Sequence, residues 1–417
     1  MTRRGRRSAA GRTVLTVVTA FVVLSGATPA GAAPTGAAPA GAASAGKRIA
    51  PGVTYRQFDI ETAGGTARAH LLTVDLADPH VRVDLLHPGV VAARATVSRL
   101  ADSAGAVAGV NGDFFDITET QHPGVEATGA AVGPAVAAGQ ALKAAVPKGQ
   151  RFGPALPPGT NTLEVFGVGT DRRARLDRLS LTGTVGTPQG RLPLKGLNQY
   201  ALPVNSVGAF TARWGSASRV RAVCGTDTQR SAPCSDDTYE VKVRGGRVVS
   251  ASDAPGSGTI PADTTVLLGR EDGARQLRGL SVGDPVDITH SLVAASSKVP
   301  YAFAIGGFPV LRGGTPLSGL NDVTSAVRTV VGTKDDGRRL LLLALDGAAA
   351  YRSGLTVAEE ADTMRSLGAT DAFNLDGGGS TEMVTRGTDE TTVTVRNHPS
   401  GGAERPVPNG IGVFSAA

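Results

Sequence analysis

The chain has 417 residues, of which 41% are hydrophobic and 19% are charged, and its formal net charge at pH 7 is +6. The first 32 residues hold five arginines and no acidic residue, so the remainder carries 6 − 5 = +1. A chain this close to neutrality has no long-range positive field that would gather nucleic acid or anionic membranes. We therefore expect no nucleic-acid partner.

The N-terminus has the layout of a secretory signal peptide. Arginines at the start are followed by an apolar run over 14–24 and by Ala30, Gly31 and Ala32, a small-residue cleavage pattern. The run is about half of the roughly 20 residues that a membrane-spanning helix needs. We predict that residues 1–32 are a signal peptide and that the protein is secreted without a membrane anchor. The general secretory and twin-arginine routes both remain open.

Residues 33–50 are rich in Ala, Gly and Pro, a composition typical of an unstructured linker. The following region, 51–417, is long enough for one elaborated domain or two closely packed ones. We divide it into an N-terminal β part (51–105), a variable β-rich part (117–300) and a C-terminal part that carries most of the motifs (301–417).

Short β-branched or alternating runs separated by turn residues predict strands through most of this region. The clearest are Ala69–Leu76, Val81–Leu86, Tyr239–Val243, Arg247–Ser250, Thr265–Leu268 and Val286–Leu292. The Gly245-Gly246 pair predicts a hairpin turn between two of them. Residues 117–160 have no clear period and are predicted to be a loop.

Cys224 and Cys234 are the only cysteines, and ten positions separate them. In an exported chain, this spacing favours a local disulfide, which would stabilise the fold by about 2 to 3 kcal/mol. A metal site built on the two cysteines would need further ligands, and the six histidines are scattered along the chain.

The C-terminal third predicts a strand, a helix and a second strand. The apolar run Leu340–Leu345 indicates a strand buried on both faces, and Asp336-Gly337 indicates a hairpin that joins it to a strand at Val327–Val331. Thr356 and Glu359 form a capping-box pattern that opens a helix, and Gly368 is suited to end it.

A strand, helix and strand in this order predict a crossover between two parallel strands. The carboxyl ends of both strands then lie at one sheet edge, which places Asp346 and Asp376 within roughly 5 to 10 Å of each other. Open sheets bind ligands at such edges. A further strand at Ala106–Val110 could bring Asn111 and Asp113 to the same place. The expected fold is α+β, with a mixed β-sheet core whose crossover carries the site, plus a β-rich variable region.

The segment after the second strand reads Asp376-Gly377-Gly378-Gly379-Ser380-Thr381. Consecutive glycines let the backbone turn its N–H groups toward an anion, and the two hydroxyls would add donors. A tight turn capped by Asp376 is an equally good interpretation of the segment alone.

These residues resemble the phosphodiester glycosidase family, to which the lysosomal uncovering enzyme and bacterial exopolysaccharide-related proteins belong. The matching motifs occur in order along the chain: NGDFF at 111–115, GGFP at 306–309, RTVVGT at 328–333, LALDG at 343–347, GLT..E at 354–359, NLDGGGSTEMV at 374–384 and ERPVPNGIGVF at 404–414. The region from about 117 to 300 matches only loosely. Near Asn397, where family members often have Asn, Pro, Ser and Asp, this chain has Gly401 instead.

The resemblance implies a hydrolase that releases a hexose or N-acetylhexosamine from a sugar-1-phosphodiester, with a glycan or sugar-phosphodiester as its only expected partner. Positive charge develops at the anomeric carbon, so Asp346, Asp376 and Glu382 are the candidate catalytic residues. The candidate substrate-binding residues are Asn111, Asp113, Arg328, Asn374, Gly377, Gly378, Gly379, Ser380, Thr381 and Arg405.

Structural roles compete with several of these assignments. Arg328 could pair with a carboxylate of a strand, Arg405 could tie the last strand to the body, and Asp113 could cap a turn. His122 and His398 each precede a proline in a loop context and are not favoured as catalytic residues.

The principal alternative function is a non-catalytic module that binds cell wall or exopolysaccharide, although aromatic residues make up only 4% of the chain. A serine hydrolase that uses Ser380 lacks the G-x-S-x-G elbow. No cofactor is required. Calcium held by Asp346, Asp376 and backbone oxygens is compatible with the residues, so metal dependence stays open. The oligomeric state and the stereochemical outcome also stay open.

Overall fold

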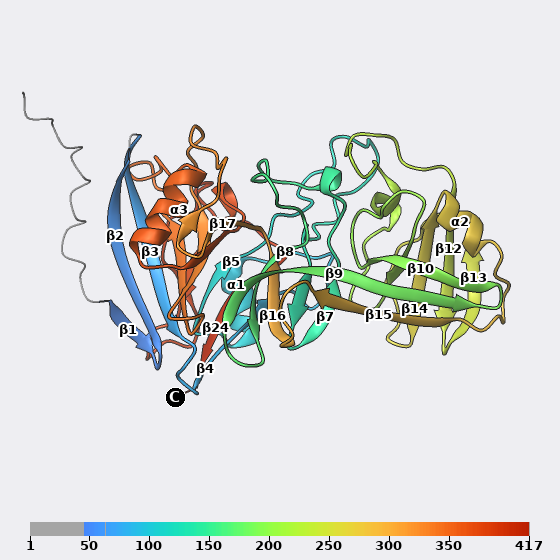
Figure 1. Cartoon of the computed structure of the whole chain (residues 1–417), viewed down its shortest axis with the longest axis horizontal. Coiled ribbons are helices and arrows are strands. Elements are labelled where there is room, and N and C mark those ends of the chain that lie inside the picture. Colours follow the sequence, from blue (N-terminus) through green and yellow to red (C-terminus); the bar gives the residue numbers. More distant parts are fainter. Residues whose placement is uncertain (1–45, 63, 417) are drawn as a thin grey trace, which may run out of the picture. The chain divides into compact units, whose positions relative to one another are not determined.

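The computed structural model describes residues 46–62 and 64–416, which are mostly β-strand with three α-helices (Figure 1). This agrees with the expected α+β class. The predicted signal peptide and residues 33–45 of the predicted linker lie outside the described residues. The linker prediction extends too far, because residues 47–50 form the first strand, β1, which pairs with β2. Within the described residues, no helix combines the length and apolar character that crossing a membrane requires.

The first sheet carries the strands that surround the DGGGS segment. Its order is β1-β2-β3-β20-β19-β21-β17-β18. The bounds are β1 Lys47–Ala50, β2 Val53–Thr62, β3 Gly65–Asp75, β17 Phe308–Arg312, β18 Thr315–Pro316, β19 Thr329–Lys334, β20 Arg339–Leu345 and β21 Asp371–Asn374.

Every hydrogen-bonded pair in this sheet is antiparallel. The prediction that this sheet mixes parallel and antiparallel pairs is therefore wrong. The two strands expected to be parallel, β20 and β21, do run in the same direction, but β19 lies between them and is antiparallel to both. The reason is the hairpin, which places β19 against one edge of β20 while β3 occupies the other edge.

The local predictions around this sheet are confirmed. The β19–β20 hairpin turns through Asp335, Asp336 and Gly337, all with positive φ. Helix α3 (Val357–Ser366) begins with the predicted capping box, and Gly368 follows it with φ 86°. Figure 1 shows α3 lying beside β17. All of β20 except its first residue is buried, as expected for a strand covered on both faces.

A second, five-stranded sheet has the order β23-β22-β5-β24-β4 and carries helix α1 (Val97–Ala104) beside it. The strands are β4 Val81–Leu86, β5 Ala108–Asn111, β22 Met383–Thr385, β23 Thr394–Val395 and β24 Gly410–Ser415. β5 pairs with both β22 and β24, so the NGDFF and STEMV motifs meet in this sheet.

The third sheet contains most of the variable part. Its order is β13-β12-β14-β11-β10-β9-β8-β16-β6-β7, and β15 pairs with β9. The bounds are β6 Ala135–Ala137, β7 Gln140–Lys143, β8 Glu164–Gly169, β9 Ala174–Thr187, β10 Gly190–Leu197, β11 Val207–Phe210, β12 Thr238–Arg244, β13 Arg247–Ser252, β14 Thr264–Arg270, β15 Asp287–Ala294 and β16 Tyr301–Gly306. A short helix, α2 (Asp272–Leu277), lies against β14. Short 3-10 turns occur at Lys148–Gln150, Val220–Val223 and Gly378–Ser380.

Each of the six predicted strands overlaps an observed one, and the Gly245-Gly246 turn joins β12 to β13. The loop prediction for 117–160 is partly wrong, because that stretch contains β6 and β7. The predicted disulfide between Cys224 and Cys234 is present. One continuous apolar core includes residues of all three sheets, among them Leu71, Phe166, Leu343 and Ile411.

Candidate active site

A pocket of about 440 Å³ lies beside the DGGGS segment. Its walls come from segments far apart in sequence: Phe114 after β5, the loop 154–157, Phe308 on β17, Arg328 before β19, and residues 374–378 after β21. This size and this combination of apolar walls with a few polar groups are typical of small-molecule sites.

Asp376 is the carboxylate of this pocket. Its backbone N–H donates to the carbonyl oxygen of Gly112 (2.8 Å), which ties the segment to the end of β5. Its Oδ1 accepts a hydrogen bond from the Gly377 N–H (3.0 Å). Burial raises the pKa of Asp376 to about 6, although Ser380, Gly377 and two nearby arginines, Arg405 and Arg151, act in the opposite direction. The group therefore ionises close to neutral pH, as acid–base and electrostatic roles require.

The glycine run forms a tight turn whose N–H groups already have partners. The N–H of Gly378 donates to the Val327 carbonyl (2.7 Å), and those of Ser380 and Thr381 donate within the turn (3.1 Å each). At these positions the N–H groups are therefore occupied by backbone carbonyl groups and do not form the expected anion-binding nest. Gly378 has φ 60°, and a Cβ there would meet nothing within 4 Å, so its α-carbon borders open space at the pocket.

Two arginines bring positive charge to the turn. The Nη1 of Arg405 donates to Ser380 Oγ (3.3 Å), and the guanidinium lies so close to Gly379 that a Cβ there would collide with it. The Arg151 guanidinium lies over the rings of Phe114 (4.9 Å) and Phe308 (5.7 Å), and its buried Nη2 has no hydrogen-bond partner. Burial lowers the pKa of Arg151 to about 10, against the attraction of Asp113 and Asp376.

Asp113 does not line the pocket and is buried, as is Lys143. Its Oδ2 accepts from the Gly133 N–H (2.6 Å), while Oδ1 has no partner. Burial raises the pKa of Asp113 to about 6 and lowers that of Lys143 to about 7, and each charge favours the charged form of the other. The Nζ of Lys143 donates to the carbonyl oxygens of Ala144 (2.6 Å) and Gly133. Asp113 is thus a buried support and not a wall of the pocket.

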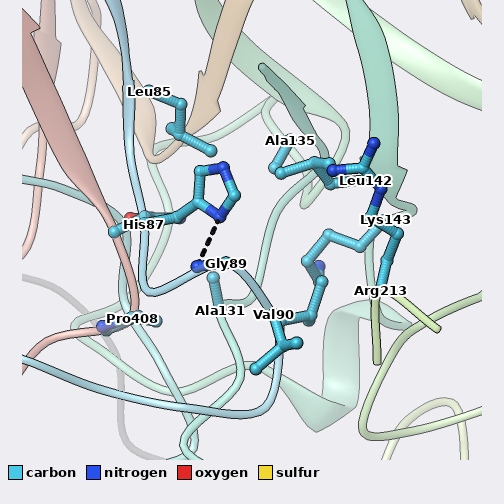
Figure 2. A pocket seen from close by; sticks show the side chains of 12 residues that line it. Leu85, His87, Gly89, Val90, Ala131, Ala135, Leu142, Lys143, Arg213 and Pro408 are labelled. Carbon is cyan, nitrogen blue, oxygen red and sulfur yellow. Dashed lines mark hydrogen bonds between the residues drawn. The ribbon is translucent and has the colours of Figure 1, made fainter. Parts of the chain in front are cut away.

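A second, much smaller cavity of about 20 Å³ is bordered by Lys143. Figure 2 shows the His87 ring beside it, with Nδ1 accepting from the Gly89 N–H (3.1 Å). A space of this volume accepts a water molecule and no sugar. It is therefore not a candidate substrate site.

The two predicted asparagines have different roles. Asn111 is fully buried, and it donates to the Asp376 carbonyl (2.7 Å) while its Oδ1 accepts from Thr329 (2.6 Å) and from the Glu382 N–H (3.0 Å). These contacts hold the DGGGS turn in place and leave no atom for a ligand. Asn374, in contrast, lines the pocket, and its buried Oδ1 has no partner.

Glu382 does not line the pocket. Its pKa is raised to about 9 by burial and by a hydrogen bond with Glu404, which in turn accepts from Ser98 (2.6 Å) near the start of α1. The two carboxyl groups thus share one proton. Thr381 also stays behind the turn, where its buried hydroxyl has no partner.

Arg328 does line the pocket, but its guanidinium is turned toward α3. It donates to the carbonyl oxygens of Leu355 (2.7 Å) and Thr324 (3.0 Å) and lies 3.7 Å from Glu360. Glu360 is fully buried with neither oxygen hydrogen-bonded, and burial raises its pKa to about 8 while Arg328 lowers it.

Asp346 faces two histidines and does not line the pocket. Its Oδ2 bonds to His70 Nε2 (3.1 Å) and His398 Nδ1 (3.0 Å), and its Oδ1 accepts from the Ala348 N–H (2.7 Å). Burial by itself raises the pKa of Asp346, but the hydrogen bonds together outweigh burial and lower the pKa. A carboxylate engaged in this way does not fit the calcium site considered above.

Among the described residues, one group could in principle hold a metal ion: His122, Cys224 and Cys234. The two sulfurs form the disulfide, so they offer no thiolate ligands. His122 itself bonds to Glu119 (2.7 Å) and to the Ala232 carbonyl (2.9 Å). This group is therefore a structural support of the loop.

Sequence analysis missed Arg151 and Lys143, and it did not favour His398. The two basic residues lie in the variable part, in contexts that carry no recognisable pattern, and they reach the site only through the third sheet. For His398 a signal existed, because it adjoins Asn397 in a motif region.

Residues 237–414 match the family model described as phosphodiester glycosidase, a span that includes six of the seven motifs in full. The resemblance inferred from those motifs is thereby confirmed. No curated protein matches the chain.

Solved structures are similar over most of the chain. A hypothetical protein from Synechocystis has a TM-score of 0.66 at 19% identity, over 88% of this chain and 62% of that one, so this chain spans less than two thirds of that protein. An exported protein from Burkholderia pseudomallei has a TM-score of 0.63 at 23% identity, over 85% and 76%. The catalytic domain of zebrafish N-acetylglucosamine-1-phosphodiester alpha-N-acetylglucosaminidase, auto-inhibited by its pro-peptide, has a TM-score of 0.42 at 15% identity, over 90% and 87%. The first two show a shared fold.

Proposed function

We propose that this chain, with its match to the phosphodiester glycosidases, is a secreted hydrolase that cleaves a hexose or N-acetylhexosamine from a sugar-1-phosphodiester. The observation that supports this most directly is that Asp376 lines a pocket of sugar size while two arginines lie close enough to lower its pKa: Arg151 over the wall residues Phe114 and Phe308, and Arg405 beside Gly379 of the turn. The reaction needs a carboxylate near the anomeric carbon and cations near the departing phosphate.

In this proposal, Arg151 and Arg405 bind the phosphodiester. Charge-assisted hydrogen bonds from guanidinium groups to phosphate oxygens are stronger than neutral ones, and Arg151 has a buried N–H without a partner. The phosphate monoester that leaves is a weak base and departs without prior protonation. Stabilising its negative charge therefore contributes more than a general acid would.

Asp376 stabilises the positive charge that develops on the sugar ring as the bond to the phosphate breaks. The free Oδ1 of Asn374 is available to accept a hydrogen bond from a sugar hydroxyl. The apolar walls from Phe114, Phe308 and the loop 154–157 exclude water from the ring and strengthen these electrostatic contacts.

Secretion is part of the proposal. It is supported by the N-terminal signal-peptide pattern, by the Cys224–Cys234 disulfide, which is typical of oxidising compartments, and by the similarity to an exported protein.

The test is release of free sugar by the protein without residues 1–32. The substrates are UDP-N-acetylglucosamine and a methyl phosphodiester of N-acetylglucosamine-1-phosphate. The Asp376→Ala variant should lose about 10² to 10⁴-fold in kcat, whereas Asp389→Asn, an exposed carboxylate, should match the wild type. No release from any sugar-1-phosphodiester would contradict the proposal and favour the non-catalytic binding module.

A further inference from the structure

Four side chains form a continuous hydrogen-bonded chain that the proposed reaction has not used. The Tyr55 hydroxyl bonds to His70 Nδ1 (2.8 Å), His70 Nε2 to Asp346 (3.1 Å), and Asp346 to His398 Nδ1 (3.0 Å). Asp346 and His70 are buried, with 2% and 1% of their surfaces exposed, whereas the His398 side chain is 74% exposed. The chain therefore begins inside the first sheet and ends at an accessible imidazole.

The hydrogen bonds define the tautomer of each ring. Asp346 is an acceptor for both histidines when ionised, so His70 donates through Nε2 and His398 donates through Nδ1. The Nδ1 of His70 then accepts from Tyr55. The free lone pair of neutral His398 is consequently on Nε2, the ring nitrogen that Asp346 does not contact.

The loop that carries His398 is clamped to the DGGGS turn. Asn397 Nδ2 donates to the Thr381 carbonyl (2.9 Å), and Ser400 Oγ donates to the Gly378 carbonyl (3.3 Å). On its other side, the Gly347 N–H donates to the His398 carbonyl (2.8 Å). His398 is thus held between the end of β20 and the turn that borders the pocket.

We propose that His398 is the general base that activates water in the proposed hydrolysis, with Asp346 as its positioning residue. This inference rests on the proposed function. A histidine oriented by a buried carboxylate is a recurring arrangement for proton abstraction, because the carboxylate fixes the tautomer and stabilises the imidazolium that forms. Asp376 is less suited to this task, because its carboxylate accepts from Gly377 and Ser380 and lies near two arginines.

The step is balanced as follows. The water oxygen forms a bond to the anomeric carbon while one of its protons moves to His398 Nε2. The bond between the anomeric carbon and the phosphate oxygen breaks, and its electron pair leaves with the phosphate monoester of the aglycone. His398 then returns the proton to solvent. Asp346 is in direct contact with its ring, and His70 on β3, on the other side of Asp346, interacts electrostatically with it.

The test uses the same sugar-release assay with the His398→Ala variant, which removes little packing because the side chain is exposed. We expect a drop of about 10² to 10³-fold in kcat with little change in KM, and partial recovery with added imidazole. The acid limb of the pH profile of kcat/KM should lose the contribution of His398 and keep that of Asp376. Asp346→Asn should lower kcat and alter the same limb. His80→Ala is the matched control, because His80 is an exposed histidine paired with Asp78 (2.9 Å) outside the site.

Two results would overturn the proposal while the proposed function stands. One is wild-type kcat in His398→Ala, and the other is a lower kcat with an unchanged pH profile and no response to imidazole. A wild-type protein that releases no sugar would remove the proposed function, and this proposal with it.

Discussion

Glu360 is a buried carboxyl group whose effect on stability can be measured. It lies on α3 with neither oxygen hydrogen-bonded, 3.7 Å from Arg328, and burial raises its pKa from 4.5 to about 8. Between these two pKa values, the folded state keeps a proton that the unfolded chain releases. The free energy of unfolding therefore falls as the pH rises through this window. Each pKa unit corresponds to about 1.36 kcal/mol, so raising the pH from 4.5 to 7 costs at most about 3 kcal/mol.

Glu360→Gln keeps the shape of the side chain and removes its titration. We expect the variant to exceed the wild type in free energy of unfolding by about 1 to 3 kcal/mol at pH 7, and the difference to vanish near pH 4.5. Urea denaturation from pH 4.5 to 8 measures this, and the fluorescence of Trp214, the single and fully buried tryptophan, reports unfolding.

The matched control is Asp362→Asn on the same helix, where the carboxylate is 58% exposed. It should leave the pH dependence of stability unchanged. If Glu360→Gln and the wild type lose stability equally between pH 4.5 and 8, Glu360 does not retain its proton in the folded state and the reasoning fails.

Two further predictions concern the pocket and the disulfide. Arg151→Gln removes a cation that lowers the pKa of Asp376, so the ionisation of Asp376 should move to higher pH. The variant should also raise KM for the sugar-1-phosphodiester about 10 to 100-fold. An unchanged KM would rule out Arg151 as a phosphate ligand. The double change Cys224→Ser and Cys234→Ser should lower the free energy of unfolding by about 2 to 3 kcal/mol in urea titrations, and equal stability would mean that the loop is held by other contacts, such as those of Gln150.

The features that could be predicted from sequence depend on short-range chemistry. The hairpin at Asp336-Gly337 and the capping box at Thr356 each need only a few neighbouring residues, and both are present. The disulfide likewise joins two cysteines that are only ten positions apart. Local patterns of this kind determine where elements begin and end.

The arrangement of the strands could not be predicted in the same way. Nothing within 340–374 indicates that β19 lies between β20 and β21, because strand order depends on which edges are already occupied. Strand β9 (Ala174–Thr187) was missed because it contains glycines, which strands usually avoid. Gly183 is required there, since a Cβ would lie 2.8 Å from the Thr289 carbonyl oxygen of β15.

In the candidate site, too, contacts between residues far apart in sequence could not be predicted. Asp376 and Asn374 were found because their motif is contiguous, and the chain places both at the pocket. Glu382 is only six positions from Asp376, yet it is paired with Glu404 near α1. Asp346 was recognised as a special carboxylate, but the two histidines that bind it come from positions 276 and 52 residues away.

The walls of the pocket come from two separate regions of the sequence. Asp376 and Asn374 follow a strand of the first sheet, whereas the loop 154–157 belongs to the segment between β7 and β8. Insertions or substitutions in that loop can reshape the opening without disturbing the strand that holds the carboxylate. Under the proposed function, changes in this loop would alter which sugars and aglycones the pocket accepts while Asp376 keeps its position.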